Sequence, residues 1–526
     1  MKRGWLLLGL VAALVASPAL AQNIATRVRD NEDKIRDLAR QIDLLRRSNK
    51  ELEARADELS KPAHDIIDAY LRDKGIAAVA WVDADGNPLE ETVQQISLSG
   101  GFRMRYEFSD NLIDYDDDAG DSMAFVNNRL RLGAGFIFSE KIEANIELMA
   151  NFLSGGGSGL NNLGAMAGAP DLGDVDLLRI YQANVTFKDV NPFGRLAYLP
   201  VDIVLGRQEL AYGTRFLLGD EGFDEGISWD AVRVVGKVTG LQVDLFAAKL
   251  VENDAVLDLG GSVTPGGYDK EADAELWGLY GSYTGIPDTV LDAYVLFLRS
   301  GGDAAGPIFN QGLADAMHMW TLGARAQGKF SKVIPGSFSY NAEVAVQLGD
   351  RTPAGATDSM DVSALGAQVE LKYTMSDVPW QPAVGLLFAY GSGDGDGDND
   401  YERFDPLFQY NHAFYGLSDL FKVQNARIFG VTVSANPTQS VQVGAAWYMS
   451  VADDQNDPWA GGVNWGGTAN DDTMANEVDL WLDMDINRNC HLQLGWAMVL
   501  PDDYIEDMTL GNDTAHRFYA NLNLSF

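Results

Sequence analysis

The spacing that most clearly points to chemistry is a run of alternating carboxylates. Glycine or asparagine separates four aspartates, Asp394, Asp396, Asp398 and Asp400. This run approaches the D-x-D-x-D start of a calcium-binding loop, because Ca²⁺ takes several oxygen ligands from closely spaced carboxylates. Such a loop has glycine at position six and glutamate at position twelve, where this chain has Asn399 and Asp405. A calcium site and a solvated acidic loop both remain open, and no other cofactor is expected.

The acidic run opens a long interruption, 391–425, between two strand-like segments. It continues into an aromatic cluster: Phe408, Tyr410, His412, Phe414 and Tyr415. Long loops with such composition are usually functional. We expect the aromatic cluster to fix the loop against the rest of the molecule, with His412 as a structural hydrogen-bonding residue.

No catalytic motif accompanies these residues. HExxH, GxSxG and a P-loop are absent; 323–329 comes close to a P-loop, but Phe330 stands where Ser or Thr would bind magnesium. None of the five histidines has metal-ligand spacing with another. A lipid-modifying enzyme would need a serine beside His516, and none is identifiable. The chain is therefore predicted to have no catalytic residues.

Charged side chains recur at every second position of several segments. We assign the following to one inward face and predict that they line a pore: Arg103, Arg105, Arg129, Arg131, Arg207, Asp230, Arg233, Arg325, Glu370, Glu477 and Asp479. Ion pairs that merely satisfy buried charge are one interpretation. A ladder that selects charged or polyhydroxylated solutes is the other.

The elements that must position these residues are strands. From Ile96 onward apolar and polar residues alternate, and eighteen segments follow, from 96–108 to 514–526. Short links such as 139–140 and 487–488 alternate with long ones such as 154–176 and 392–421. This alternation is typical of transmembrane β-barrels with short periplasmic turns. The predicted fold is an all-β transmembrane barrel over 95–526, with about eighteen antiparallel strands and the 391–425 stretch as a large outer loop.

Export is predicted by the first segment. Residues 1–21 have a basic start, an apolar run and a small-residue cleavage site, as in a secretory signal peptide. No later run of about 18 apolar residues follows, so a membrane protein of this sequence would have to be a barrel. A net charge of −37 and a pI near 4.3 argue against nucleic-acid binding. The single cysteine, Cys490, excludes an internal disulfide.

A heptad pattern follows the signal peptide. Residues 22–60 repeat apolar positions every seven, with Val28, Ile35 and Ile42 in one row and Leu38, Leu45, Leu52 and Leu59 in the other. We predict a periplasmic coiled coil that joins copies of the chain, as a trimer, through 28–59. A single amphipathic helix packed on its own domain is the alternative. Residues 61–94 are predicted to be a linker with a short helix.

Several motifs of the barrel region resemble the alginate export family of outer-membrane barrels. They are LGRQELAYG at 205–213, LGD at 218–220, WDAVR at 229–233, FDPLF at 404–408, NEVDL at 476–480 and the final strand. The resemblance implies an eighteen-stranded barrel that passes an anionic polysaccharide through an arginine-lined constriction. It also implies that Arg207 and Arg233 lie in the lumen with Asp230 beside them. The coiled coil is not part of the family's pattern.

These observations together predict a passive outer-membrane channel, or porin, surrounded by outer-membrane lipid. Its solutes would be charged or polyhydroxylated, with an anionic polysaccharide such as alginate as one case. The alternative is a structural anchor whose coiled-coil arm tethers the barrel to the cell wall or to partner proteins.

Overall fold

The computed structural model describes most of the chain from residue 93 onward. The chain divides into two units, 1–92 and 93–526, and only the second is described. The predicted signal peptide, coiled coil and nearly all of the linker lie outside the described residues. These are 93–112, 115–116, 122–154, 178–192, 200–220, 223, 226–251, 274–301, 315–331, 336–353, 356–395, 399–410, 412, 414–461, 463–464, 469–508 and 511–526.

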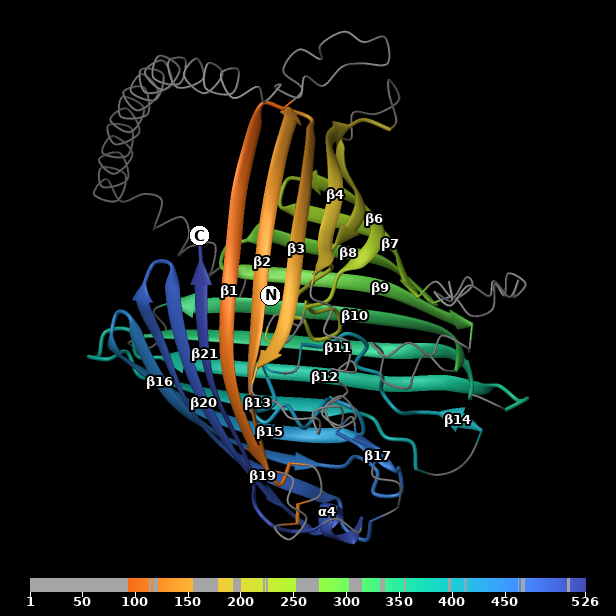
Figure 1. Cartoon of the computed structure of the whole chain (residues 1–526). Coiled ribbons are helices and arrows are strands. Elements are labelled where there is room, and N and C mark those ends of the chain that lie inside the picture. The colour runs from red at the N-terminus through yellow and green to blue at the C-terminus, as the bar shows by residue number, and fades with distance from the viewer. Residues whose placement is uncertain are drawn as a thin grey trace, which may run out of the picture. The chain divides into compact units, whose positions relative to one another are not determined.

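Eighteen long strands form a closed antiparallel barrel (Figure 1), which confirms the predicted barrel of about eighteen strands. They are β1 (Gln95–Asp110), β2 (Met123–Ser139), β3 (Ile142–Ser154), β4 (Arg179–Val190), β5 (Val201–Gln208), β6 (Trp229–Val238), β7 (Leu241–Val251), β8 (Ala274–Ile286), β9 (Thr289–Gly301), β10 (Ala316–Ser331), β11 (Ser337–Thr352), β12 (Met360–Thr374), β13 (Ala383–Gly391), β15 (Ala426–Thr438), β16 (Val441–Val451), β19 (Thr473–Asn487), β20 (Cys490–Pro501) and β21 (Ala515–Ser525).

Pairing of the first strand with the last closes the barrel. β1 and β21 run antiparallel, with Gly101 opposite Ser525 and Asp110 opposite His516. The remaining described elements lie in the long loops: β14 (Asp400–Tyr401), β17 (Trp459–Ala460), β18 (Val463–Asn464) and the short helix α4 (Asp503–Asp507). Among the described residues, no helix is long and apolar enough to span a membrane.

Alternation along each strand separates two faces. In β1 the charged side chains Arg103, Arg105 and Glu107 are buried, whereas Met104 and Tyr106 are 43% and 40% exposed. A soluble sheet would bury the apolar face instead. Apolar residues outside and polar residues inside are the pattern expected of a barrel in lipid, because the bilayer takes the place of a core.

The long loops fold into the lumen. The β5–β6 loop contacts β11, where Thr214 Oγ1 donates to Glu343 at 3.2 Å, and it contacts β1, where Arg105 Nη1 donates to the carbonyl of Phe223 at 2.5 Å. β11 and β1 lie several strands from β5 and β6 on opposite sides of the sheet order. One loop reaches both only by crossing the interior of the barrel.

Candidate functional site: a cavity beneath the inward loops

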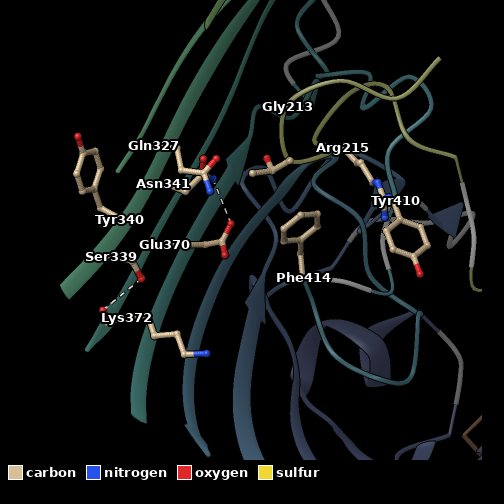
Figure 2. A pocket seen from close by; sticks show the side chains of 11 residues that line it. Gly213, Arg215, Gln327, Ser339, Tyr340, Asn341, Glu370, Lys372, Tyr410 and Phe414 are labelled. Atoms are coloured by element: carbon tan, nitrogen blue, oxygen red, sulfur yellow. Dashed lines mark hydrogen bonds between the residues drawn. The ribbon is translucent and has the colours of Figure 1, made fainter. Parts of the chain in front are cut away.

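A cavity of about 430 Å³ lies between the inward loops and the wall formed by β10, β11 and β12. Figure 2 shows its two sides, strand residues on one and loop residues on the other. Eleven residues line it: Gly213, Thr214, Arg215, Gln327, Ser339, Tyr340, Asn341, Glu370, Lys372, Tyr410 and Phe414. Of these, Tyr340 directs its ring away from the cavity, toward the outward face of β11 (Figure 2). Its strand residues sit near the ends of β10–β12 that carry the short turns, so the cavity lies on the turn side of the loops.

Hydrogen-bonding groups dominate the strand side. Asn341 and Glu370 face each other across β11 and β12, and Asn341 Nδ2 donates to Glu370 Oε1 at 3.2 Å. Gln368 Nε2 donates to the same oxygen at 2.6 Å. Ser339 and Lys372 form the next pair toward the turns on this face. The amides of Asn341 and Gln368 therefore partly satisfy the carboxylate of Glu370. Lys372 is the cation among the strand residues that line the cavity.

A strained arginine forms part of the loop side. Arg215 has a φ of +71°, a left-handed conformation that is unfavourable by roughly 1–3 kcal/mol for a residue other than glycine. Two backbone hydrogen bonds hold it: its N–H donates to Tyr212 at 2.9 Å, and its carbonyl accepts from Tyr410 at 3.1 Å. Its guanidinium lies 5.3 Å from the centroid of the Tyr410 ring and 3.3 Å from Asp220. A cation and an aromatic face are thus presented together.

A ladder of tyrosines ties the β5–β6 loop to the wall. The ring of Tyr212 stacks on Tyr280 with centroids 4.7 Å apart, and Tyr280 stacks on Tyr294 at 5.4 Å. Tyr212 also donates to Asp244 at 3.2 Å, and Arg233 Nε donates to that carboxylate at 2.7 Å. Stacked aromatic pairs each contribute about 0.5–1.5 kcal/mol beyond their buried area, so this end of the loop is firmly placed.

Hydrogen bonds between wall side chains and loop backbone fix the β13–β15 loop. Glu477 accepts from the Ser418 N–H at 2.8 Å, and Asp479 accepts from the Leu417 N–H at 3.0 Å. Gln347 makes a two-way amide pair with the backbone of Asp405, at 2.6 and 2.8 Å. The wall carboxylates that face this loop are therefore occupied by loop backbone.

A chain of charges joins the two loops to β1 and β21. Arg517 lies 2.9 Å from Glu107 and 2.5 Å from Asp419. His412 Nδ1 lies 2.9 Å from both oxygens of Asp419, which agrees with the predicted structural role of His412, and its ring stacks on Phe223. Burial favours the neutral form of Asp419, but the positive charges of His412 and Arg517 prevail and hold its pKa down to about 2.

Nine of the eleven predicted pore-lining residues lie on the inward face. Arg103, Arg105, Arg129, Arg131, Arg233, Arg325, Glu370, Glu477 and Asp479 share the parity of residues that contact the loops or the lumen wall. Of these, only Glu370 lines the cavity. Arg325 pairs with Asp292 at 2.7 Å, and Arg131 lies over the Tyr181 ring at 4.2 Å. Whether they line a conduction path stays a prediction.

The structure places Arg207 and Asp230 elsewhere. They pair with each other at 2.7 Å and remain 42% and 57% exposed. They lie in the outward row with the exposed Leu205 and Val232. Asp230 and Arg233 are three residues apart in one strand, so they point to opposite faces. This corrects the expectation that the three share the lumen.

The cavity's own cations were not among the predicted site residues. Lys372 follows the same alternation as Glu370, so the period-two pattern contained its signal. Arg215 belongs to a loop and left no periodic signal. In the acidic run, Asp394 donates its N–H to Asp457 at 3.0 Å, whereas Asp396 and Asp398 lie outside the described residues. Among the residues described, no group of three or more acidic, His or Cys side chains is arranged to hold a metal ion; calcium stays a prediction.

Comparison with known proteins identifies the family of this chain. The model of the family described as alginate export matches residues 94–518. The chain belongs to the alginate export family. No curated protein sequence matched this family member.

Several solved structures share the fold of this chain. OccK8 (OprE) of Pseudomonas aeruginosa is 10% identical with a TM-score of 0.53, and the match covers 83% of this chain and 99% of that one. OprD of the same organism is 9% identical with a TM-score of 0.52, covering 83% and 94%. OccAB2 of Acinetobacter baumannii is 12% identical with a TM-score of 0.51, covering 83% and 99%. The alginate export family member thus shares the β-barrel fold of these solved structures.

Proposed function

We propose that this barrel is a passive channel for acidic, polyhydroxylated solutes, namely saccharides that carry carboxylates. The observation that carries the proposal is the cavity beneath the loops, where Arg215 and Lys372 accompany Tyr410 and Phe414 among hydroxyl and amide groups. The family description, alginate export, agrees with an anionic polysaccharide as solute.

Each part of the cavity matches one part of such a solute. Guanidinium and ammonium groups donate charge-assisted hydrogen bonds to carboxylates. The faces of Tyr410 and Phe414 offer apolar surface to the C–H side of a sugar ring. Ser339, Gln327 and Asn341 supply donors and acceptors for hydroxyls. Several weak contacts suit a channel better than one tight site, because conduction requires that the solute also leave.

Transport in this proposal is diffusive, since no energy-coupling motif occurs in the sequence. We propose further that residues 22–60 form a periplasmic arm, and that this arm assembles copies of the chain through residues 28–59. Measuring the mass of the protein in detergent with and without that arm tests this part. An unchanged monomer would contradict it.

Single-channel recording in planar bilayers tests the channel itself. We expect an ionic current that an oligosaccharide of uronic acid interrupts more strongly than a neutral oligosaccharide of equal length. Arg215→Gln and Lys372→Gln should each weaken the interruption by about tenfold, the effect of one charge-assisted hydrogen bond. Lys141→Gln, in the exposed β2–β3 turn, is the matched control and should leave it unchanged.

Two results would count against the proposal, at different levels. A purified barrel that conducts no ions, even after the β13–β15 loop is shortened, would contradict the channel. A barrel that conducts but treats acidic and neutral oligosaccharides alike would retain the channel and remove the solute class.

A further inference from the structure

A row of charged side chains crosses the outward face of eight neighbouring strands, β5 to β12. The strand register places them directly opposite one another: Arg207, Asp230, Lys249, Glu275, Arg299, His318, Asp350 and Asp361. Each lies an even number of positions from the exposed apolar residues of its strand, such as Leu205, Val232 and Trp320, and so points to the same outward face. We call this set the charged row. It lies at the long-loop ends of the strands, one residue from the end of β5.

The face below the charged row carries no charge. Toward the short turns, the outward positions of these eight strands hold only apolar, aromatic, glycine, Ser or Thr residues, as in β10 from Trp320 to Phe330 and in β11 from Leu348 to Phe338. The change from charged to apolar is complete within one row. Such an edge is expected where hydrocarbon meets headgroups, because charge inside the apolar layer is strongly unfavourable.

The length of the apolar face agrees with that placement. The next outward row below the charges contains Trp277, Phe297 and Trp320, and Phe297 and Trp320 lie 4.5 Å apart. At the opposite edge stand Phe330, Phe338 and Tyr340. From Trp320 to Phe330 the strand rises roughly 34 Å, which at a tilt of about 40° spans roughly 26 Å of membrane, close to a barrel's usual apolar band. The charged row therefore sits at headgroup height.

We propose that the centre of the charged row is a binding site for the phosphate headgroup of an outer-leaflet lipid. Lys249, Arg299 and His318 supply the donors, and the rings of Trp277, Phe297 and Trp320 receive the start of the acyl chains. The carboxylates of the row keep the cations at the surface: Glu275 lies 3.4 Å from Lys249, and Asp350 lies 3.1 Å from His318.

Arg299 is the principal residue of this site. It stands between Glu275 and His318 in the register, above Phe297 in its own strand. Among the described residues, no ion pair joins Arg299 to a carboxylate, whereas such pairs do occupy Arg207 and Lys249. Phosphate suits it, because guanidinium donates two parallel hydrogen bonds to phosphate oxygens.

Native mass spectrometry of the full-length protein in detergent, titrated with diphosphorylated lipid A, tests the site. We expect binding by the unaltered chain and about tenfold weaker binding by Arg299→Gln, the loss of one charge-assisted interaction. Arg488→Gln, in the β19–β20 turn at the opposite edge, is the matched control and should bind as the unaltered chain does. Lipid A without phosphates should bind weakly to all three. If Arg299→Gln does not fold, Lys249→Gln should show the same weakening.

Three results would overturn the proposal. Equal binding of phosphorylated lipid by Arg299→Gln and by the control would remove the site. If millimolar inorganic phosphate fully displaced lipid A, the site would be one for free anions and not for a lipid headgroup. An oligomer that becomes a monomer in Arg299→Gln would make the charged row a contact between copies of this chain. Arg299 faces away from the lumen, so ion conductance should not change, which separates this test from that of the channel.

Discussion

Gln347 offers the sharpest test of how the β13–β15 loop is held in the lumen. Its side chain is fully buried, and its amide both donates to and accepts from the backbone of Asp405. Gln347→Leu keeps a similar volume but removes both hydrogen bonds and leaves the Asp405 backbone unpaired. A hydrogen bond is worth about 1 kcal/mol net, and an unsatisfied buried group is unfavourable by about 1–3 kcal/mol. We take roughly 3 kcal/mol as the loss, which corresponds to about a hundredfold more of the detached loop.

Amide hydrogen exchange measures that population directly. We expect exchange at Asp405 and Phe408, whose N–H groups bond to Gln347 and Leu217, to quicken by about a hundredfold. Unfolding of the barrel itself should hardly change, since loops open locally. Gln442→Leu, which removes a hydrogen bond to Asn436 beside a short turn, is the control. Exchange within threefold of the unaltered chain at both amides would refute the assigned role of Gln347.

Two further predictions concern the same loop. Gly416→Ala should increase trypsin cleavage in the loop severalfold, because Gly416 has a φ of +112° and a Cβ there would lie 2.4 Å from Glu477. Gly101→Ala is the control and should not increase cleavage, since the nearest atom to a Cβ there is at 3.5 Å. Equal cleavage of the two variants would contradict the role of Gly416 in placing the loop. Because the pKa of Asp419 is lowered to about 2, its roughly 2 kcal/mol of loop stability should be present above pH 4 and lost as pH falls toward 2. Protection factors, which remove the intrinsic pH dependence of amide exchange, check this between pH 6 and pH 2 and should be flat in Asp419→Asn. Flat protection factors in the unaltered chain would contradict the assignment.

The barrel could be predicted because each strand carries its own signal. Val344, Val346 and Leu348 recur at every second position of β11, and the two-residue turns fix where neighbouring strands reverse. All eighteen predicted strands are present. The same rule, applied strictly, also places Arg207, since it lies in register with the outward Leu205. Arg207 was nevertheless predicted to face inward, both in the row of charged residues and by the family resemblance, and the exposed Leu205 of its own strand was the better guide.

The cavity could not be predicted from the sequence. Tyr410 and Phe414 were identified as part of a packed aromatic cluster, but their partners across the cavity are Asn341, Glu370 and Lys372, far away along the chain. No local pattern records which strand a loop meets after it enters the lumen. Arg215 adds a second obstacle, because tertiary contacts and not its residue type impose its left-handed backbone.

The closure of β1 on β21 has a consequence for the order of assembly. Residues at the two ends of the barrel sequence, such as Asp110 and His516, must meet before the wall is complete. The loops also bind residues of these two strands: Arg517 of β21 pairs with Asp419 of the β13–β15 loop, and Arg105 of β1 bonds to Phe223 of the β5–β6 loop. Contacts so distant in sequence form slowly, because a long chain must first be brought together. Arg517 holds both Asp419 of the β13–β15 loop and Glu107 of β1, so this anchor of the loop is complete only once β1 and β21 have paired. The loop should therefore reach its final position at or after closure of the barrel.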